Sequence, residues 1–407
     1  MDLLTEQLRA IVGDEAVRAE PDELLVYECD GLPQHKHLPR AVVFPDSTAQ
    51  VSEVLALLAR EQVPFTPRGA GTGLSGGALA MNQGVVIELA RMRQILEIDA
   101  VNRLAVVQPG VVNLHVSRAV AHLGLHYVPD PSSQPTCTIG GNIAENAGGP
   151  HCLKYGVTLN HVLAITAVLP DGEIVTLGSD TGEREGYDLL GAFIGSEGCF
   201  GVALDVTVKL TKKPPAVRTM LADFTSVDDA ARVTSAIVAT GIVPAALEFM
   251  DSATIRVVES SIYAAGYPAD AAAVLLIELD GLAAGVEADV NTVREICLAG
   301  RAREVKVAGN DAERLRLWQG RKKAFGAMGR MAPHLVVQDA VIPRTRLAEI
   351  LATIAQIAAA RRVTVCNVFH AGDGNLHPNI PYNADDPDES ERVHLAMGEI
   401  MRACVDA

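Results

Sequence analysis

A glycine-rich segment at residues 67–77 constrains the fold of this chain more than any other feature. Five of the nine residues from position 69 to position 77 are glycine. Because glycine has no side chain, the backbone N–H groups of such a segment can close around an anion, and concave nests of this kind bind phosphate. The segment therefore predicts a phosphate-binding loop, and a glycine-rich hairpin without a ligand is the alternative.

The same segment matches the GxGxxG pattern of dinucleotide-binding proteins at residues 71–76. That pattern is informative only where a strand precedes it and a helix follows it. A strand-like segment precedes the loop at residues 64–67, but an Asn-Gln-Gly turn at residues 82–84 and a strand-like run at residues 85–89 follow it. We therefore interpret the segment as a phosphate loop held between strands and not as a Rossmann NAD site.

The composition excludes several classes of function. The net charge of −16 argues against binding to nucleic acid or to an anionic membrane surface. No apolar run is long enough to span a bilayer, and the N-terminus lacks the pattern of a signal peptide, so we expect a cytoplasmic protein. The seven cysteines include no CxxC pair, which predicts reduced thiols and no iron–sulfur cluster.

The pattern of apolar residues predicts three regions along the 407 residues. Residues 1–40 form a helical lead-in, and strands alternate with helices over residues 41–215, where a Lys-Lys-Pro-Pro stretch marks a boundary. Over residues 216–407, the pattern predicts an α+β domain of antiparallel strands with helices on one face. Within it, the spacing predicts a helix over residues 311–326 and a strand over residues 363–369.

Two further glycine-rich segments lie at residues 138–149 and 195–201. The first belongs to a stretch, residues 129–150, that is too long for an idle loop, and such loops commonly carry function. Small residues there would let a flat ring approach the backbone, and a closely packed turn is the alternative. Three glycine-rich loops in one domain fit a long, folded cofactor with a pyrophosphate and a planar ring, and FAD has that shape.

A pair of histidines, His370 and His377, flanks an Asp-Gly-Asn turn after the predicted strand 363–369. Imidazoles suit Zn²⁺, Fe²⁺ or Mn²⁺, but a metal centre needs a third ligand. The alternative is a turn whose histidines satisfy buried partners. On the predicted helix 311–326, Arg321 could grip a carboxylate with two hydrogen bonds, or it could belong to the basic end of a surface helix.

Six segments in register give the chain a clear resemblance to a known family. It resembles the flavoprotein family of FAD-linked D-2-hydroxy acid dehydrogenases over its whole length, and within that family the members that oxidise glycolate. The matching segments, in chain order, are residues 27–32, 67–77, 138–149, 195–202, 318–322 and 369–378.

The resemblance implies an α+β protein with two functional domains. Residues 41–215 would form a two-part FAD-binding domain of the vanillyl-alcohol oxidase or PCMH type. Residues 216–407 would form a substrate domain with a ferredoxin-like sheet. Relatives with covalent flavin place a histidine in the first glycine-rich loop, and residues 67–77 contain none, so the FAD would be bound without a covalent bond.

The resemblance also assigns cofactor contacts to the three glycine-rich segments and to a short stretch before the second. The expected FAD-binding residues are Pro67, Arg68, Gly69, Ala70, Gly71, Thr72, Gly73, Ser75, Gly76, Pro131, Ser132, Thr138, Gly140, Gly141, Asn142, Ala144, Asn146, Ala147, Gly148, Glu197, Gly201 and Val202.

The implied reaction is the oxidation of a small D-2-hydroxy acid, glycolate to glyoxylate, by hydride transfer from C2 to flavin N5. Arg321 would hold the substrate carboxylate, and His370 and His377 would bind a divalent metal beside the substrate hydroxyl. Oxidation of D-lactate is the alternative, although residues 318–322 and 338–344 look more like the glycolate-oxidising members.

One departure from the family pattern affects catalysis. Family members continue after the last predicted helix, residues 389–405, into a Glu-His-Gly motif that supplies the third metal ligand and a base, and we expect this chain to lack it. A non-catalytic FAD-binding subunit is therefore the alternative of another class. Electrons would pass to other oxidase subunits, to a quinone-linked acceptor or to another acceptor protein. Partner subunits could place the chain at a membrane periphery.

Overall fold

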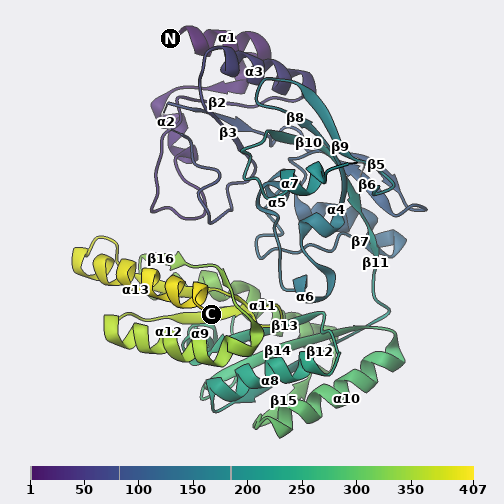
Figure 1. Ribbon diagram of the computed structural model, residues 1–407, viewed down its shortest axis with the longest axis vertical. Coiled ribbons are helices and arrows are strands. Elements are labelled where there is room, and N and C mark those ends of the chain that lie inside the picture. The colour runs from purple at the N-terminus through teal and green to yellow at the C-terminus, as the bar shows by residue number, and fades with distance from the viewer. Residues whose placement is uncertain (1, 82, 184–185) are drawn as a thin grey trace. The chain divides into compact units, whose positions relative to one another are not determined.

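The computed structural model describes residues 2–81, 83–183 and 186–407; Asn82 of the predicted turn lies outside the described residues. The chain divides into two compact units (Figure 1). Unit 1 comprises Met1–Gly149 and Tyr155–Lys213, and unit 2 comprises Pro150–Lys154 and Pro214–Ala407.

The first part of unit 1 is a small sheet covered by two helices. The strand order is β1-β2-β4-β3, with β2, β4 and β3 parallel, as expected where helical or loop crossovers connect strands. Ser47 caps the covering helix α3 by accepting a hydrogen bond from the N–H of Gln50. The elements are α1 (Leu3–Val12), η1 (Asp14–Ala16), β1 (Val17–Arg18), α2 (Pro21–Leu24), η2 (Leu25–Tyr27), β2 (Ala41–Val43), α3 (Thr48–Arg60), β3 (Phe65–Arg68) and β4 (Val85–Glu88).

The second part of unit 1 is an antiparallel sheet with strand order β5-β6-β10-β8-β9. Its apolar face packs against the short helices α4, α5 and α7. The glycine-rich stretch 138–149, predicted as a loop, contains the helix α5, so that prediction was wrong over seven residues. The elements are β5 (Ile95–Asp99), β6 (Leu104–Val107), α4 (Asn113–Val120), η3 (Ala121–Leu123), β7 (Leu125–His126), α5 (Ile139–Glu145), α6 (Cys152–Tyr155), η4 (Thr158–His161), β8 (Val162–Val168), β9 (Ile174–Gly178), α7 (Leu189–Phe193), β10 (Val202–Lys209) and β11 (Thr211–Lys212).

Unit 2 is built on one antiparallel sheet with the order β15-β12-β14-β13-β18-β19-β17, to which β20 and β16 add beyond β18. The helix predicted over residues 311–326 is α11. The elements are β12 (Ala216–Phe224), α8 (Val227–Ala239), β13 (Ala246–Asp251), α9 (Ser252–Glu259), β14 (Ala273–Gly281), α10 (Ala283–Ala299), β15 (Glu304–Val307), α11 (Asp311–Met328), β16 (His334–Val337), β17 (Ala340–Val341), η5 (Arg344–Arg346), α12 (Leu347–Arg361), β18 (Cys366–His370), β19 (Asn375–Leu376), β20 (Pro378–Tyr382) and α13 (Pro387–Val405).

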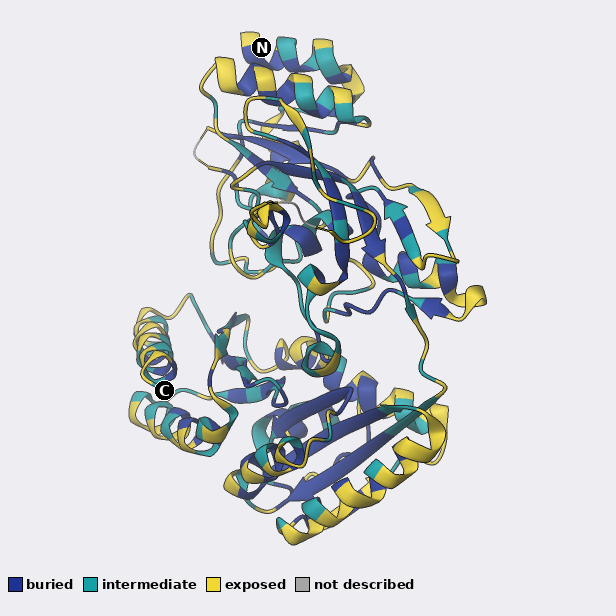
Figure 2. Cartoon of the chain, turned by 45° about the vertical axis from the view of Figure 1, so that its right-hand side comes forward, coloured by how far each residue is buried: buried dark blue, intermediate teal, exposed yellow. Residues whose placement is uncertain are grey.

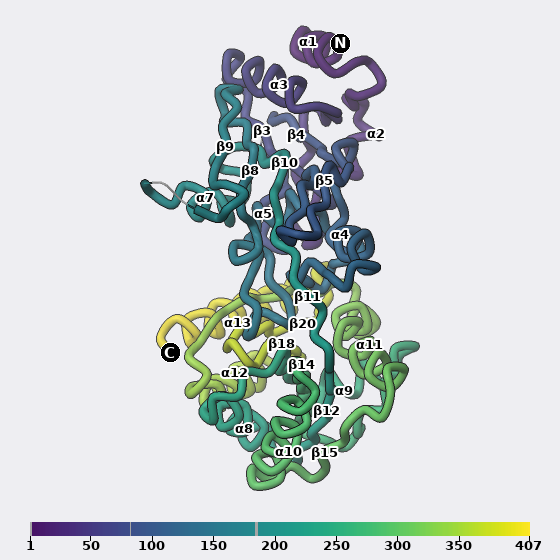
Figure 3. The backbone as a smooth tube through the Cα atoms, turned by 90° about the vertical axis from the view of Figure 1, so that its right-hand side faces the viewer, coloured from purple at the N-terminus to yellow at the C-terminus, as the bar shows by residue number. Residues whose placement is uncertain are grey.

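Helices cover both faces of the unit 2 sheet, and the prediction of helices on one face was wrong. Alternate residues of β13 and β14 pack against α8, α10, α12 and α13 on one side and against α9 and α11 on the other (Figure 3). The central strands are consequently buried along nearly their whole length, whereas α10 exposes its outer side (Figure 2). A continuous apolar run such as residues 271–277 is the sequence signature of a strand buried on both faces.

Candidate functional site

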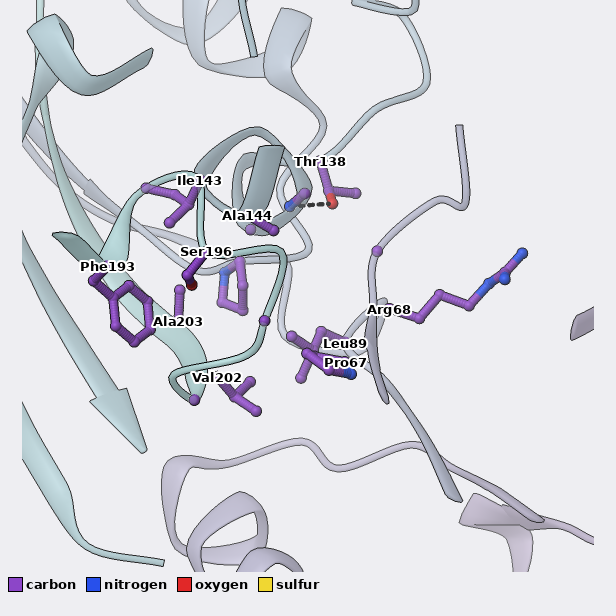
Figure 4. A pocket seen from close by; sticks show the side chains of 16 residues that line it. Pro67, Arg68, Leu89, Thr138, Ile143, Ala144, Phe193, Ser196, Val202 and Ala203 are labelled. Carbon is purple, nitrogen blue, oxygen red and sulfur yellow. Dashed lines mark hydrogen bonds between the residues drawn. The ribbon is translucent and has the colours of Figure 1, made fainter. Parts of the chain in front are cut away.

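A cavity in unit 1 lies among the end of β3, the first turns of α5 and the start of β10 (Figure 4). The side chains of Pro67 and Leu89 lie on one side of it, and those of Phe193 and Ala203 lie on the other. Several expected cofactor residues line this cavity: Pro67, Arg68, Gly69, Thr138, Gly140, Gly141, Ala144, Gly201 and Val202.

Three glycines of the cavity, Gly69, Gly140 and Gly198, stand where a side chain would collide with a neighbouring residue. A Cβ atom on Gly69 would lie 2.3 Å from Thr138 Oγ1, and one on Gly198 would lie 2.5 Å from a ring carbon of Pro67. A Cβ atom on Gly140 would lie 2.8 Å from Pro109. Glycine at these positions therefore lets neighbouring segments pack closely, and the cavity wall combines their backbone with apolar side chains.

The loop after β3 is held open by groups from the N-terminal segment. Asp30, which is buried, accepts hydrogen bonds from the N–H of Gly76 at 2.9 Å and of Leu32 at 2.8 Å. The N–H of Gly31 donates to the carbonyl of Gly73 at 2.9 Å. Gly76 has a φ of +84°, a conformation that favours glycine. The loop conformation is thus fixed from outside the loop.

Arg68 also stabilises the loop after β3. Its guanidinium points away from the cavity (Figure 4) and donates from Nη1 to the carbonyl of Ala78 at 3.2 Å. Its Nε lies 3.8 Å from the carboxylate of Glu88, and the guanidinium stacks over Tyr27 at 5.8 Å. Burial raises the pKa of Glu88 to about 7, against the opposing effect of Arg68. Both side chains are buried, so this pair supports the loop from within the fold.

The remaining expected cofactor residues do not line the cavity. The side chain of Asn142 accepts a hydrogen bond from Asn113, and that of Asn146 accepts one from the N–H of Leu159, so both amides bind protein groups. Ser75 donates to Glu145 at 3.0 Å. The full set outside the cavity lining is Ala70, Gly71, Thr72, Gly73, Ser75, Gly76, Pro131, Ser132, Asn142, Asn146, Ala147, Gly148 and Glu197.

Sequence reasoning missed several residues of the cavity wall. Ile143, Ser196 and Gly198 carried a signal, since they belong to the second and third glycine-rich segments, whereas the others are residues that only the packing brings here. The missed residues are Leu89, Pro109, Ile143, Phe193, Ser196, Gly198 and Ala203.

A cluster of polar side chains in unit 2 centres on Glu248, a residue that sequence reasoning also missed. Glu248 on β13 and His370 at the end of β18 are directly paired across the two antiparallel strands. Glu248 Oε1 lies 2.8 Å from His370 Nδ1. The carboxylate is fully buried, so it depends on such partners.

Arg321 reaches the same carboxylate from α11. Its Nη2 lies 2.5 Å from Glu248 Oε2, and the arginine is 6% exposed. Gly320 lets α11 approach, because a Cβ atom there would lie 2.8 Å from the hydroxyl of Tyr267. Across the described residues, Arg321 Nε is a buried donor without a hydrogen-bond acceptor.

The predicted histidine pair comes together around its turn. The rings of His370 and His377 lie 5.2 Å apart and perpendicular, and His377 Nδ1 lies 3.5 Å from Asp339. Asp373 accepts a hydrogen bond from the N–H of Asn375 at 3.2 Å and so closes the turn. Within residues 2–81, 83–183 and 186–407, no three His, Cys, Asp or Glu side chains gather as metal ligands, so the residues present do not fit a three-ligand centre.

The cluster maintains a defined charge state. Burial alone would raise the pKa of Glu248, but the charges of Arg321 and His370 and their hydrogen bonds lower it below its usual range. Burial, followed by the charges of His370 and Arg321, lowers the pKa of His377. At neutral pH the cluster therefore combines an ionised carboxylate, a guanidinium and a neutral imidazole of His377.

Models of two protein families match the chain. The FAD binding domain matches residues 39–178, and the C-terminal domain of FAD linked oxidases matches residues 213–407.

Of the helices that the structure describes, none combines the length and apolar character that crossing a membrane requires.

Curated relatives match nearly the whole chain. It is 49% identical to the glycolate oxidase subunit GlcD of Escherichia coli strain K12, over 95% of this chain and 77% of that protein. Identity to the glycolate oxidase subunit GlcD of Bacillus subtilis is 42%, over 98% of this chain and 85% of that protein. A D-lactate dehydrogenase of Anaerostipes hadrus is 34% identical, over 91% of this chain and 78% of that protein.

A solved structure shares the fold. The structure of p-cresol methylhydroxylase with substrate bound has a TM-score of 0.85 at 17% identity, over 98% of this chain and 86% of that chain. This confirms the fold class that the resemblance implied, an α+β protein with an FAD-binding domain of the vanillyl-alcohol oxidase or PCMH type.

Proposed function

The chain belongs to the family of FAD-linked oxidases, and from this premise we propose that it oxidises a small D-2-hydroxy acid, with glycolate as the first substrate and glyoxylate as the product. The observation that carries this proposal is the buried Arg321, whose Nε has no acceptor among the described residues. A buried guanidinium with a spare donor fits a small carboxylate. The 49% identity to a glycolate oxidase subunit supports glycolate over other acids.

Unit 1 would hold FAD without a covalent bond. The backbone at Gly69, Gly140 and Gly201 offers the close approach that the ring system needs. The N–H groups of the loop after β3 would hold the pyrophosphate. That loop contains no histidine to bond the flavin. When bound, FAD supplies the acceptor for a hydride from C2 of the acid.

Unit 2 would bind and orient the acid. Arg321 would hold the carboxylate through Nε. His370 would accept the hydrogen bond of the C2 hydroxyl at Nε2 and take its proton as C2 loses hydride, because its Nδ1 is already bound to Glu248. His377 would supply a second, neutral imidazole beside the first.

Among the described residues, the side chains near His370 and His377 do not fit the divalent metal that the resemblance implies. Two imidazoles without a third ligand bind a metal weakly. We therefore assign no step of the reaction to a metal ion.

The electrons would leave through another protein. The sequence has no cysteine pair for an iron–sulfur cluster, and the relatives in Escherichia coli and Bacillus subtilis are named as subunits. We infer that the chain works with other oxidase subunits or an acceptor protein, in the cytoplasm or at a membrane periphery through those partners.

The visible spectrum of the purified, FAD-containing protein under anaerobic conditions tests the proposal. Bleaching of the flavin band by glycolate is the expected result, and faster bleaching by D-lactate would favour the alternative suggested by the D-lactate dehydrogenase relative. A flavin band that persists with both acids would contradict the proposed reaction and leave the chain as a non-catalytic FAD-binding subunit.

A further inference from the structure

Glu248 lies in the middle of β13 with its side chain fully buried, and its two carboxylate oxygens contact different residues. Oε1 accepts a hydrogen bond from His370 Nδ1, and Oε2 meets Arg321 Nη2. A carboxylate buried without partners costs several kcal/mol. The two contacts offset part of that cost, and they also restrict the two partners.

Each contact engages one nitrogen of its partner and leaves another nitrogen without a contact to Glu248. Nδ1 of His370 faces the Glu248 carboxylate, so it is Nε2 of the ring that is left to contact another group. The guanidinium of Arg321 is held at Nη2, while Nε has no acceptor among the residues that the structure describes. The cluster thus presents one acceptor and one cationic donor.

This pair of groups matches the chemistry of a 2-hydroxy acid, which carries a hydroxyl donor next to a carboxylate. We propose that Glu248 is a positioning residue for substrate, which orients Arg321 for the carboxylate and His370 for the hydroxyl at the same time. The inference deepens the proposed function and rests on it.

The register of the sheet supports a fixed geometry. Because Glu248 and His370 are directly paired across β13 and β18, their Cβ atoms are held together by the backbone and not by side-chain flexibility. Phe249 and Phe369, the next pair in register, stack on the opposite face of the sheet with ring centroids 4.8 Å apart, and they stabilise that register. A substrate would therefore meet the two groups in a preset arrangement, which reduces the entropy lost on binding.

Glu248→Gln in the FAD-containing protein tests the inference. The amide oxygen of Gln can still accept from His370, but its NH₂ group cannot accept from Arg321. The primary readout is the affinity for oxalate, a two-carbon acid without a C–H bond to oxidise, measured by its perturbation of the flavin spectrum. We expect the Kd of oxalate and the KM of glycolate to rise at least about tenfold, with kcat falling by a smaller factor.

Two further variants complete the design. Glu248→Asp keeps the charge, but its shorter side chain cannot reach both His370 and Arg321. It should show the same loss of oxalate affinity. It also replaces Glu248→Gln in the experiment if that variant does not fold. Glu278→Gln is the matched control, since Glu278 is a second buried carboxylate in the same sheet, with Trp318, Thr219 and His151 as its partners. It should bind oxalate like the wild type.

The outcomes separate the two proposals. Folded, flavin-loaded Glu248 variants that bind oxalate and oxidise glycolate like the wild type would overturn the positioning role alone, even where their thermal stability is lower. A wild-type protein that binds no oxalate and is reduced by no 2-hydroxy acid would overturn the proposed function and this inference with it.

Discussion

The carboxylate of Asp30 accepts a hydrogen bond from the backbone N–H of Gly76, linking two positions 46 residues apart. The contact joins the N-terminal segment to the glycine-rich loop expected to hold the pyrophosphate of FAD. Since Asp30 is buried, the bond is shielded from water. Because the Gly76 N–H is already bound to Asp30, the proposed contacts to phosphate would fall to other N–H groups of the loop.

Replacement of Asp30 by Ala should weaken FAD binding. A buried N–H left without its acceptor costs about 1–3 kcal/mol, and the loop can avoid that cost only by changing its conformation. We expect the Kd of FAD to rise about tenfold or more, measured by fluorescence of free FAD during reconstitution. Glu28→Gln is the control, because Glu28 pairs with the exposed Lys36. Equal FAD affinity in folded Asp30→Ala protein would count against a role in the loop.

Glu88 should make the free energy of unfolding fall as pH rises. Its pKa is raised from 4.5 in the reference state to about 7 in the folded protein, mainly by burial. Its full contribution to stability is therefore present below pH 4.5 and is lost progressively up to about pH 7. The slope should approach about 1.4 kcal/mol per pH unit. The charged or titratable groups that face it are Arg68 and Tyr27.

Denaturant unfolding of wild type and Glu88→Gln from pH 4.5 to pH 7.5 measures this contribution. The variant should lose the part of the pH dependence of the unfolding free energy that comes from Glu88. The difference in unfolding free energy between the two proteins should therefore change with pH. Glu97→Gln, at an exposed position on β5, should leave the wild-type slope intact. Parallel curves for wild type and Glu88→Gln would show that Glu88 does not titrate in this range.

Replacement of Arg321 by Lys should separate substrate binding from stability. Lys keeps a positive charge beside Glu248 but loses the fork of donors, so we expect the KM of glycolate to rise about 100-fold with little loss of stability. Arg321→Met should in addition destabilise the fold by about 3–5 kcal/mol, because it leaves a buried carboxylate without its cation. Steady-state kinetics and thermal unfolding measure the two effects. Lys323→Met, at an exposed position on α11, is the control and should leave the KM of glycolate unchanged. An unchanged KM in Arg321→Lys would exclude Arg321 as the carboxylate ligand.

Gly69→Ala should weaken FAD binding because the new side chain would clash with the hydroxyl of Thr138. The new Cβ atom would lie 2.3 Å from Thr138 Oγ1 but 3.6 Å from Thr138 Cβ, an ordinary contact. Overpacking of this kind costs about 1–3 kcal/mol. The double variant Gly69→Ala with Thr138→Ala should therefore regain much of the lost affinity. A double-mutant cycle of FAD affinity tests this, and strictly additive losses would contradict the predicted clash.

Much of the architecture could be read from the sequence because it depends on local patterns. The helix predicted over residues 311–326 is observed at Asp311–Met328, and the strand predicted over residues 363–369 is observed at Cys366–His370. Glycine-rich segments likewise mark positions where the backbone must remain bare, and Gly69, Gly140 and Gly201 do line one cavity. These features follow from residue type and spacing alone.

Long-range packing decided what the sequence alone could not predict. Residues 139–145 form a helix despite two glycines, because Thr138 caps it and Gly140 packs against Pro109. Arg68 is drawn beneath its own loop by Glu88 and Ala78, which lie farther along the chain. Glu248 reads in sequence as one polar residue in an apolar strand. Only the pairing of β13 with β18 and the approach of α11 bring its carboxylate to His370 and Arg321, because register and helix packing depend on the surface buried by the whole unit and not on any local segment.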